Sequence, residues 1–228
     1  SGWLSIPDRH DPNLVSIKTW LESKGDKVFI IHRIDKDTSG LMVIARSRAC
    51  MDALVSLISK RHVHRQYLAL THRSWQGGGR DVDLPIGRDP RQRLRMAVVD
   101  LAKQSGKTAH TSLRCLESQD LGCLVHCTLH TGRTHQIRVH LKSIGHTLFG
   151  DPRYGGNQIL KGTLYSKYKQ FVENCLSILP RQALHAKVLG FERAQVKVTR
   201  AGYAAWSKQV YSRRPRQTLT AKLLPSSK

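Results

Sequence analysis

Acidic residues are scarce in this chain. Its 228 residues include 16 Asp and Glu against 38 Lys and Arg, which gives a formal net charge of +22. The sequence contains no apolar run of membrane length and no signal-peptide pattern, so a membrane anchor does not explain the positive charge. We expect a cytoplasmic protein with no membrane association. A positive excess of this size is what phosphate backbones select, and RNA is therefore the leading partner.

Cysteines are few, and their spacing is irregular. The five of them form an odd set in apolar stretches, which argues against a disulfide framework and indicates reduced core thiols. Cys123, His126 and Cys127 could be imagined as metal ligands, but in a strand alternate side chains point to opposite faces. The sequence also lacks the clustered carboxylates of two-metal sites, so we expect no metal and disfavour a metal-dependent nuclease.

Strands and helices mix without a regular alternation or an internal repeat, and this pattern favours a single α+β domain. The length is sufficient for one sizeable core. Apolar runs predict strands over 28–31, 41–45, 63–71 and 124–131, and a hairpin is expected within the basic stretch 84–99.

Apolar stripes predict three helices. The first starts after Ser47 as N-cap, the second has Thr134 as its cap and closes at Gly145, and the third ends at Pro180. Their expected buried residues are Met51, Leu54, Val55 and Ile58 in the first, Ile137, Leu141 and Ile144 in the second, and Tyr168, Phe171, Val172, Cys175, Leu176 and Leu179 in the third.

A short polar loop, residues 32–40, joins the first two predicted strands and contains Asp35. Loops held by strands often carry catalytic side chains, and a carboxylate can act there as a nucleophile or as a base. Most aspartates in such turns only bond their own backbone. On local sequence alone, the interpretation of Asp35 as a turn residue that bonds its own backbone is favoured.

Three motifs change this balance. They are His-Arg-Ile-Asp-Lys-Asp-Thr-Ser-Gly at 32–40, Thr-Gly-Arg-Thr-His-Gln-Ile-Arg-Val-His at 131–140 and Arg-Gln-Ala-Leu-His-Ala at 181–186. In order and spacing they resemble the RluA family of RNA pseudouridine synthases, and the resemblance runs from about Ser1 to Phe191. It implies an α+β pseudouridine synthase catalytic fold, with a mixed, mostly antiparallel central sheet flanked by helices and loops. It also implies isomerisation of uridine by base flipping, a reaction that needs no metal or cofactor.

The resemblance assigns catalytic roles to three residues. Asp35 falls on the family's catalytic position, Tyr67 on the tyrosine that stacks on the uracil and is a candidate acid or base, and Arg138 on the arginine that holds the aspartate ionised. From the residues alone, Tyr67 could equally be a half-buried packing residue, and Arg138 could lie on the exposed face of a helix.

Six further residues are assigned to substrate binding. By resemblance, Arg33 takes the space of the flipped uridine, although a surface cation is the commoner case, and His32 is assigned with it. The start of the second helix suits phosphate, although a plain N-cap is compatible with the same residues, which are Arg133, Thr134 and His135. Leu184 either closes the pocket over the base or is an ordinary core leucine.

The likeness also suggests a domain division. We expect a catalytic domain over 1–200, trimmed at its start and without the upstream RNA-binding module of many relatives, followed by a basic C-terminal extension over 201–228. After Glu192 the sequence has nine Lys and Arg and no acidic residue. Loss of the upstream module should weaken substrate selection before it weakens chemistry.

The segment 151–156 and the long connection to Pro180 most resemble the branch called RluD-like, which modifies large-subunit ribosomal RNA. We therefore favour rRNA as the substrate of a monomeric enzyme, with tRNA as the alternative. A non-catalytic RNA-binding or ribosome-assembly protein on the same fold would explain the charge equally well. It would not explain why Asp35, Tyr67 and Arg138 are all present.

Overall fold

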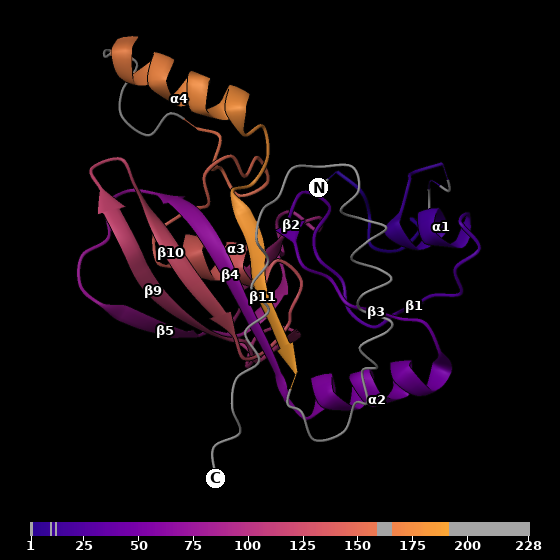
Figure 1. Ribbon diagram of the computed structural model, residues 1–228. Coiled ribbons are helices and arrows are strands. Elements are labelled where there is room, and N and C mark those ends of the chain that lie inside the picture. Colours follow the sequence, from indigo (N-terminus) through magenta and orange to yellow (C-terminus); the bar gives the residue numbers. More distant parts are fainter. Residues whose placement is uncertain (1, 10, 12, 159–165, 192–228) are drawn as a thin grey trace.

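The computed structural model describes residues 2–9, 11, 13–158 and 166–191. A six-stranded sheet dominates this part of the chain (Figure 1). All its neighbouring strands pair antiparallel except β2 and β11, which run parallel, so the predicted mixed, mostly antiparallel sheet is confirmed. In spatial order the strands are β2 (Ser39–Gly40), β11 (Leu184–Phe191), β4 (Val63–His72), β10 (Gly122–Leu129), β9 (His110–Gln119) and β5 (Gly79–Asp83).

In the described part of the chain, two smaller sheets and four helices accompany this sheet. One sheet pairs β1 (Phe29–Ile30) with β3 (Ile44–Ala45), and the other has the order β7 (Met96–Val98), β6 (Ile86–Arg88) and β8 (Gly106–Lys107). The β6–β7 pair is the hairpin predicted within 84–99. The helices are α1 (Ile17–Glu22), α2 (Arg48–Ser59), α3 (Gln136–Ser143) and α4 (Ser166–Ile178).

The main core lies between one face of the large sheet and α3, which Figure 1 shows behind β4. Strand β10 alternates strictly, with Cys123, Val125 and Cys127 buried against Ile137 and Leu141 of the helix. All five cysteines are free, and of these Cys123 and Cys127 are buried, whereas Cys50, Cys115 and Cys175 are half-buried. Within the described ranges, no group of His, Cys, Asp and Glu could hold a metal ion, and no helix is long and apolar enough to cross a membrane.

Helix α2 has its predicted N-cap, because Ser47 accepts a hydrogen bond from the backbone N–H of Cys50. Its predicted stripe is partly wrong. Val55 is 44% exposed, whereas Leu57 is buried beside Leu54. The buried face is therefore rotated toward position 57, because it packs against β3 and the start of β4.

The predicted capping of α3 by Thr134 is wrong. Thr134 is exposed, and the N-cap residue is His135, whose backbone is left-handed with φ 56° and ψ 21°. The Gln136 side chain replaces a conventional cap: its Oε1 accepts the backbone N–H of Arg133 and the hydroxyl of Thr131. Gly145 closes the helix at φ +83°, as predicted.

Helix α4 ends one residue before Leu179, in agreement with the expected stop at Pro180, and buries Val172 with Cys175, Leu176 and Leu179 against Phe149. The predicted C-terminal extension, 201–228, and the last residues of the predicted catalytic domain lie outside the described residues.

Candidate active site

Two carboxylates converge on the buried guanidinium of Arg138, in α3. Asp151 accepts two hydrogen bonds, from Nε at 2.7 Å and from Nη2 at 2.9 Å. The remaining terminal nitrogen, Nη1, donates to Oδ2 of Asp35 at 2.9 Å. Arg138 is 6% exposed and Asp151 is 0% exposed, so this pair is shielded from water, whereas the Asp35 side chain is 21% exposed. Bidentate contact in such surroundings fixes direction as well as charge.

The loop that presents Asp35 is braced at several points. The Asp35 carbonyl accepts the backbone N–H of Thr38, whose own buried Oγ1 accepts from Gln182. Gly40 has φ +111°, and a Cβ there would collide with the backbone of Ala186. Short parallel pairing of β2 with β11 thus depends on this glycine. The loop is consequently a rigid connection between strands.

The third motif, 181–186, supplies much of this bracing. Arg181 donates to the carbonyl of Asp37 at 3.1 Å and to Oγ of Ser39 at 3.2 Å. The sequence assigned no role to His185 of the same motif. Its Nδ1 lies 2.9 Å from Oγ of Ser39. The motif therefore fixes the Asp35 loop to the large sheet.

The positive charge of Arg138 is stabilised by its two partners. Burial alone would lower the pKa of Arg138, but the hydrogen bonds and charges of Asp151 and Asp35 outweigh it and raise the pKa. The guanidinium therefore stays charged. Within the described part of the chain Asp35 accepts one side-chain hydrogen bond, at Oδ2, so its Oδ1 is the oxygen left for a reacting group.

His135 also faces Asp35, with Nε2 3.9 Å from Oδ2. Its Nδ1 lies 2.8 Å from the hydroxyl of Tyr154, which in turn accepts the backbone N–H of Met96. Burial lowers the pKa of His135 to about 4, despite the opposing charge of Asp35. A neutral ring that accepts at Nδ1 carries its proton on Nε2, toward the carboxylate.

Tyr67 lies on the face of β4 that carries the core. Burial, and then the charge of Asp35, raise its pKa, while Arg65 acts in the opposite direction. The phenol is therefore neutral at pH 7 and offers a flat ring with one hydrogen-bond donor. Asp35, Arg138, His135 and Tyr67 thus make up a compact polar group at one end of the apolar core.

Sequence comparisons identify the family of the chain. The family model described as RNA pseudouridylate synthase matches residues 5–143. The chain belongs to this family. The RluA-type resemblance of the motifs is thereby confirmed.

Relatives with names of this kind are numerous. The chain is 48% identical over 157 residues to a ribosomal large subunit pseudouridine synthase D of Nitrosomonas europaea, which covers 69% of this chain and 42% of that protein. It is 40% identical over 163 residues to a Bacillus subtilis protein named as an uncharacterized RNA pseudouridine synthase, with 72% and 47% covered. The chain thus spans about half the length, or less, of these curated relatives.

A solved structure shares the fold. Human RNA pseudouridylate synthase domain containing 1 aligns with a TM-score of 0.61 at 25% identity, over 76% of this chain and 68% of that one. The predicted α+β pseudouridine synthase fold is therefore confirmed.

The six predicted substrate-binding residues have different surroundings in this family member. Arg33 is exposed at the loop, free to meet a ligand. His32 accepts the backbone N–H of Val43 with Nε2, at 3.0 Å, and burial followed by the charge of Arg65 lowers its pKa to about 4. It therefore braces the loop against the segment before β3.

Arg133 donates from Nε to the carbonyl of Thr108 at 2.9 Å, and Thr134 is exposed beside it. Leu184 is 5% exposed, belongs to the main core cluster and pairs with Ala69 of β4. Its surroundings are those of an ordinary core leucine.

Sequence reasoning missed Asp151 and Tyr154 as site residues. Both lie in the segment 151–156, which had served only to indicate a branch of the family. The sequence did contain an indication of this role, because Asp151 comes shortly after the apolar pair Leu148-Phe149 and is therefore expected near the core. A buried carboxylate needs a cation as its partner.

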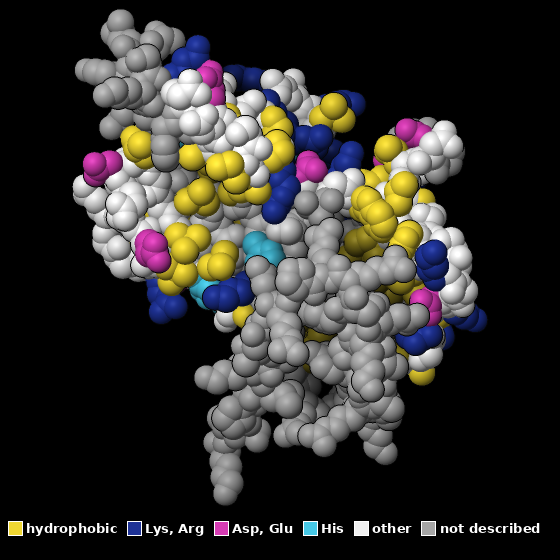
Figure 2. All heavy atoms as spheres, turned by 45° about the horizontal axis from the view of Figure 1, so that its top comes forward, with side chains coloured by type: hydrophobic (Ala, Val, Ile, Leu, Met, Phe, Trp, Pro, Cys, Tyr) yellow, Lys and Arg dark blue, Asp and Glu magenta, His cyan; other side chains and the backbone are white. Residues whose placement is uncertain are grey.

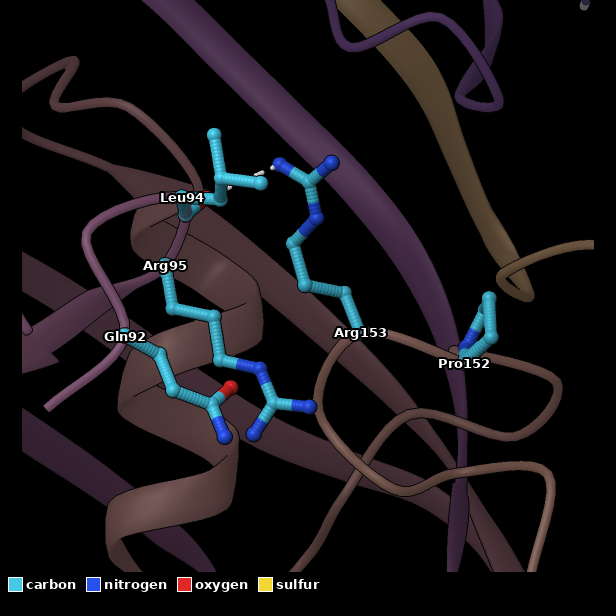
Figure 3. A pocket seen from close by; sticks show the side chains of 5 residues that line it. All are labelled: Gln92, Leu94, Arg95, Pro152 and Arg153. Carbon is cyan, nitrogen blue, oxygen red and sulfur yellow. Dashed lines mark hydrogen bonds between the residues drawn. The ribbon is translucent and has the colours of Figure 1, made fainter.

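An open hollow of about 360 Å³ adjoins this segment (Figure 3). Arg153 crosses it, and its Nη1 donates to the carbonyl of Leu94 at 3.1 Å. The lining residues are Gln92, Leu94, Arg95, Pro152 and Arg153. The space-filling view shows Lys and Arg side chains gathered along the middle of one face, between groups of hydrophobic side chains (Figure 2). The residues that line the hollow come from the arginine-rich hairpin and from the turn that carries Asp151.

Proposed function

We propose that this chain is the catalytic region of an RNA pseudouridine synthase, and that it isomerises uridine in structured RNA with Asp35 as the essential carboxylate. The observation that carries the proposal is the fixed Asp35–Arg138–Asp151 arrangement, which holds one carboxylate oxygen and leaves the other to a substrate. A protein that only binds RNA has no use for a negative charge in its groove.

The reaction breaks the bond between uracil N1 and ribose C1′ and joins C1′ to C5. A proton leaves C5, and N1 carries one in the product, so no oxidant or reductant is consumed. Asp35 assists this exchange through its free oxygen, with Arg138 fixing the orientation of the carboxylate. Tyr67 supplies a flat, neutral ring against which the base can turn, and Arg33 fills the space of the flipped nucleotide.

We further propose large-subunit rRNA as the substrate, because the relatives with this name are similar over about 70% of the chain. The proposal includes a monomeric enzyme in the cytoplasm, a catalytic domain over 1–200 and a basic extension over 201–228 that adds phosphate contacts. The hollow beside Arg95 and Arg153 would receive a nucleotide that neighbours the target.

Mapping of pseudouridines in rRNA and tRNA, from cells with and without the gene, tests activity and substrate together. We expect at least one large-subunit rRNA site to disappear and to return with the parent gene, but not with Asp35→Asn. Loss of a tRNA site instead would replace the substrate assignment. No lost site, with RNA binding intact, would favour the non-catalytic alternative.

A further inference from the structure

Arg65 lies on the same face of β4 as the candidate active-site tyrosine. Side chains alternate along a strand, so positions 65, 67 and 69 share one face, and Ala69 of this face is fully buried in the main core. The charge of Arg65 acts on both Tyr67 and His32. Arg65 is therefore part of the polar surroundings of the site, at the end of β4 where the strand begins.

Within the described residues, the Arg65 side chain takes part in no ion pair and no hydrogen bond. Its Nε is buried without a hydrogen-bond partner. Burial is the main influence on the pKa of Arg65 and lowers it, and the Tyr67 phenol acts in the opposite direction. Buried cations are normally paired, and an unpaired one lowers the stability of the fold.

Gly132, in the second motif, makes room for this unpaired cation. A Cβ atom at Gly132 would lie 2.5 Å from Nη1 of Arg65 and 3.5 Å from its Cζ. Gly132 itself is exposed, so the outer end of the guanidinium lies beneath a surface position while its Nε is enclosed. The chain thus places an unpaired cation at the rim of the site and keeps the space above it open.

From this geometry we propose that Arg65 and the cleared position at Gly132 form a binding site for a backbone phosphate of the RNA, at or next to the nucleotide that enters the site. The proposal rests on the proposed function and adds a residue-level anchor for its substrate. A guanidinium offers planar, two-point contact to phosphate oxygens, and such a contact is strongest where water is excluded.

An arginine kept for a ligand and an arginine kept for the fold respond differently to removal. Arg65→Met preserves the apolar stem but removes the cation. We expect RNA affinity to fall by about 10- to 100-fold, as for a charge-assisted hydrogen bond, while the thermal unfolding midpoint stays equal or rises. Arg114→Met is the matched control, because Arg114 is exposed on the opposite face of the same sheet, and it should change affinity far less.

Gly132→Ala tests the same site without removing the charge. The added Cβ must displace the end of the Arg65 side chain, which is flexible, so the fold should tolerate it. We expect a loss of RNA affinity similar to that of Arg65→Met, and no further loss when the two changes are combined. Unchanged affinity in both single variants would overturn the proposal, as would a lowered unfolding midpoint in Arg65→Met with normal affinity.

Binding to RNA oligonucleotides with single methylphosphonate linkages identifies the ligand. We expect one neutral linkage, at or beside the target uridine, to weaken the parent and to have no added effect on Arg65→Met. If instead Arg65→Met couples to changes in the uracil ring and to no phosphate, the phosphate assignment is wrong. These measurements need no turnover, so a parent protein that binds in this way but forms no pseudouridine would remove the proposed function and leave the anchor standing.

Discussion

Arg138 and Arg65 both lie beside the candidate active site, and their surroundings are opposite. Arg138 donates hydrogen bonds to two carboxylates, from Nε and from both terminal nitrogens. The Arg65 side chain makes no hydrogen bond in the described part of the chain, and its Nε is enclosed and unpaired. The first arrangement uses the cation to hold a reacting carboxylate. The second keeps its charge available, which is useful only if a negatively charged substrate arrives. The same residue type thus serves chemistry in one place and affinity in the other.

Arg138→Lys should have the largest effect among changes that test this contrast. An ammonium group cannot contact Asp151 at two points and Asp35 at a third. We expect turnover at saturating RNA to fall by about 1,000-fold, or ~4 kcal/mol in the barrier, with RNA affinity changed less than threefold. Single-turnover rates and filter binding on one transcript measure both. Normal turnover of the lysine variant would mean that Arg138 is not a partner of the catalytic group.

Asp151→Asn should have the next largest effect. The amide keeps the size of the side chain but leaves Arg138 with one carboxylate, so the guanidinium loses its fixed direction. We expect turnover to fall by about 100-fold and the free energy of unfolding by about 3 kcal/mol, as when a buried pair is broken. Asp100→Asn, at an exposed pair, is the control. A turnover loss in the control of the same size would remove the special role of Asp151.

Arg33→Ala should separate flipping from chemistry. Arg33 is exposed, and its proposed role is to stabilise the flipped nucleotide, which costs a few kcal/mol in a paired stem. We expect a loss of about tenfold in turnover on a folded stem-loop and little loss on a short unpaired RNA. Equal losses on both RNAs would contradict the role.

Low pH should destabilise the site without any substitution. His32 and His135 have pKa values of about 4 in the folded protein, below the ordinary value of 6.5. The unfolded chain therefore binds more protons between these pH values. Stability contributed by the two neutral rings is complete above pH 6.5 and is lost as the pH falls toward 4.

Urea unfolding from pH 7 to pH 4.5 measures this loss. His32→Gln keeps an acceptor for Val43 but no titrating ring, and it should reduce the slope of stability against pH. A slope identical to that of the parent would show that His32 is protonated normally in the folded protein.

The sequence predicted the parts of the fold that depend on local pattern. The α2 cap, the end of α3 at Gly145, the hairpin and the alternation of β10 follow from residue order alone. Capping at Thr134 failed because Gln136 turns back to the preceding backbone, a contact that propensities do not describe. The prediction that Val55 is buried was wrong because the elements that pack against a helix decide which of its faces is buried.

For the site, the motifs indicated Asp35, Tyr67 and Arg138 through their resemblance to a family. The geometry then added what no motif could. Asp151 reaches Arg138 because the chain reverses after α3, and Arg65 meets Gly132 because β4 lies beside the end of β10. Both contacts depend on tertiary packing, so neither could be derived from spacing along the chain.

The central claim is that Asp35 performs chemistry while its surroundings hold it. The most direct test is single-turnover pseudouridine formation at saturating RNA by the parent and by Asp35→Asn, with affinity measured on the same transcript. We predict no detectable product from Asp35→Asn and an affinity within about twofold of the parent, because the amide keeps the shape but cannot act as a nucleophile or base. Activity within about tenfold of the parent, ~1.4 kcal/mol in the barrier, would contradict the account.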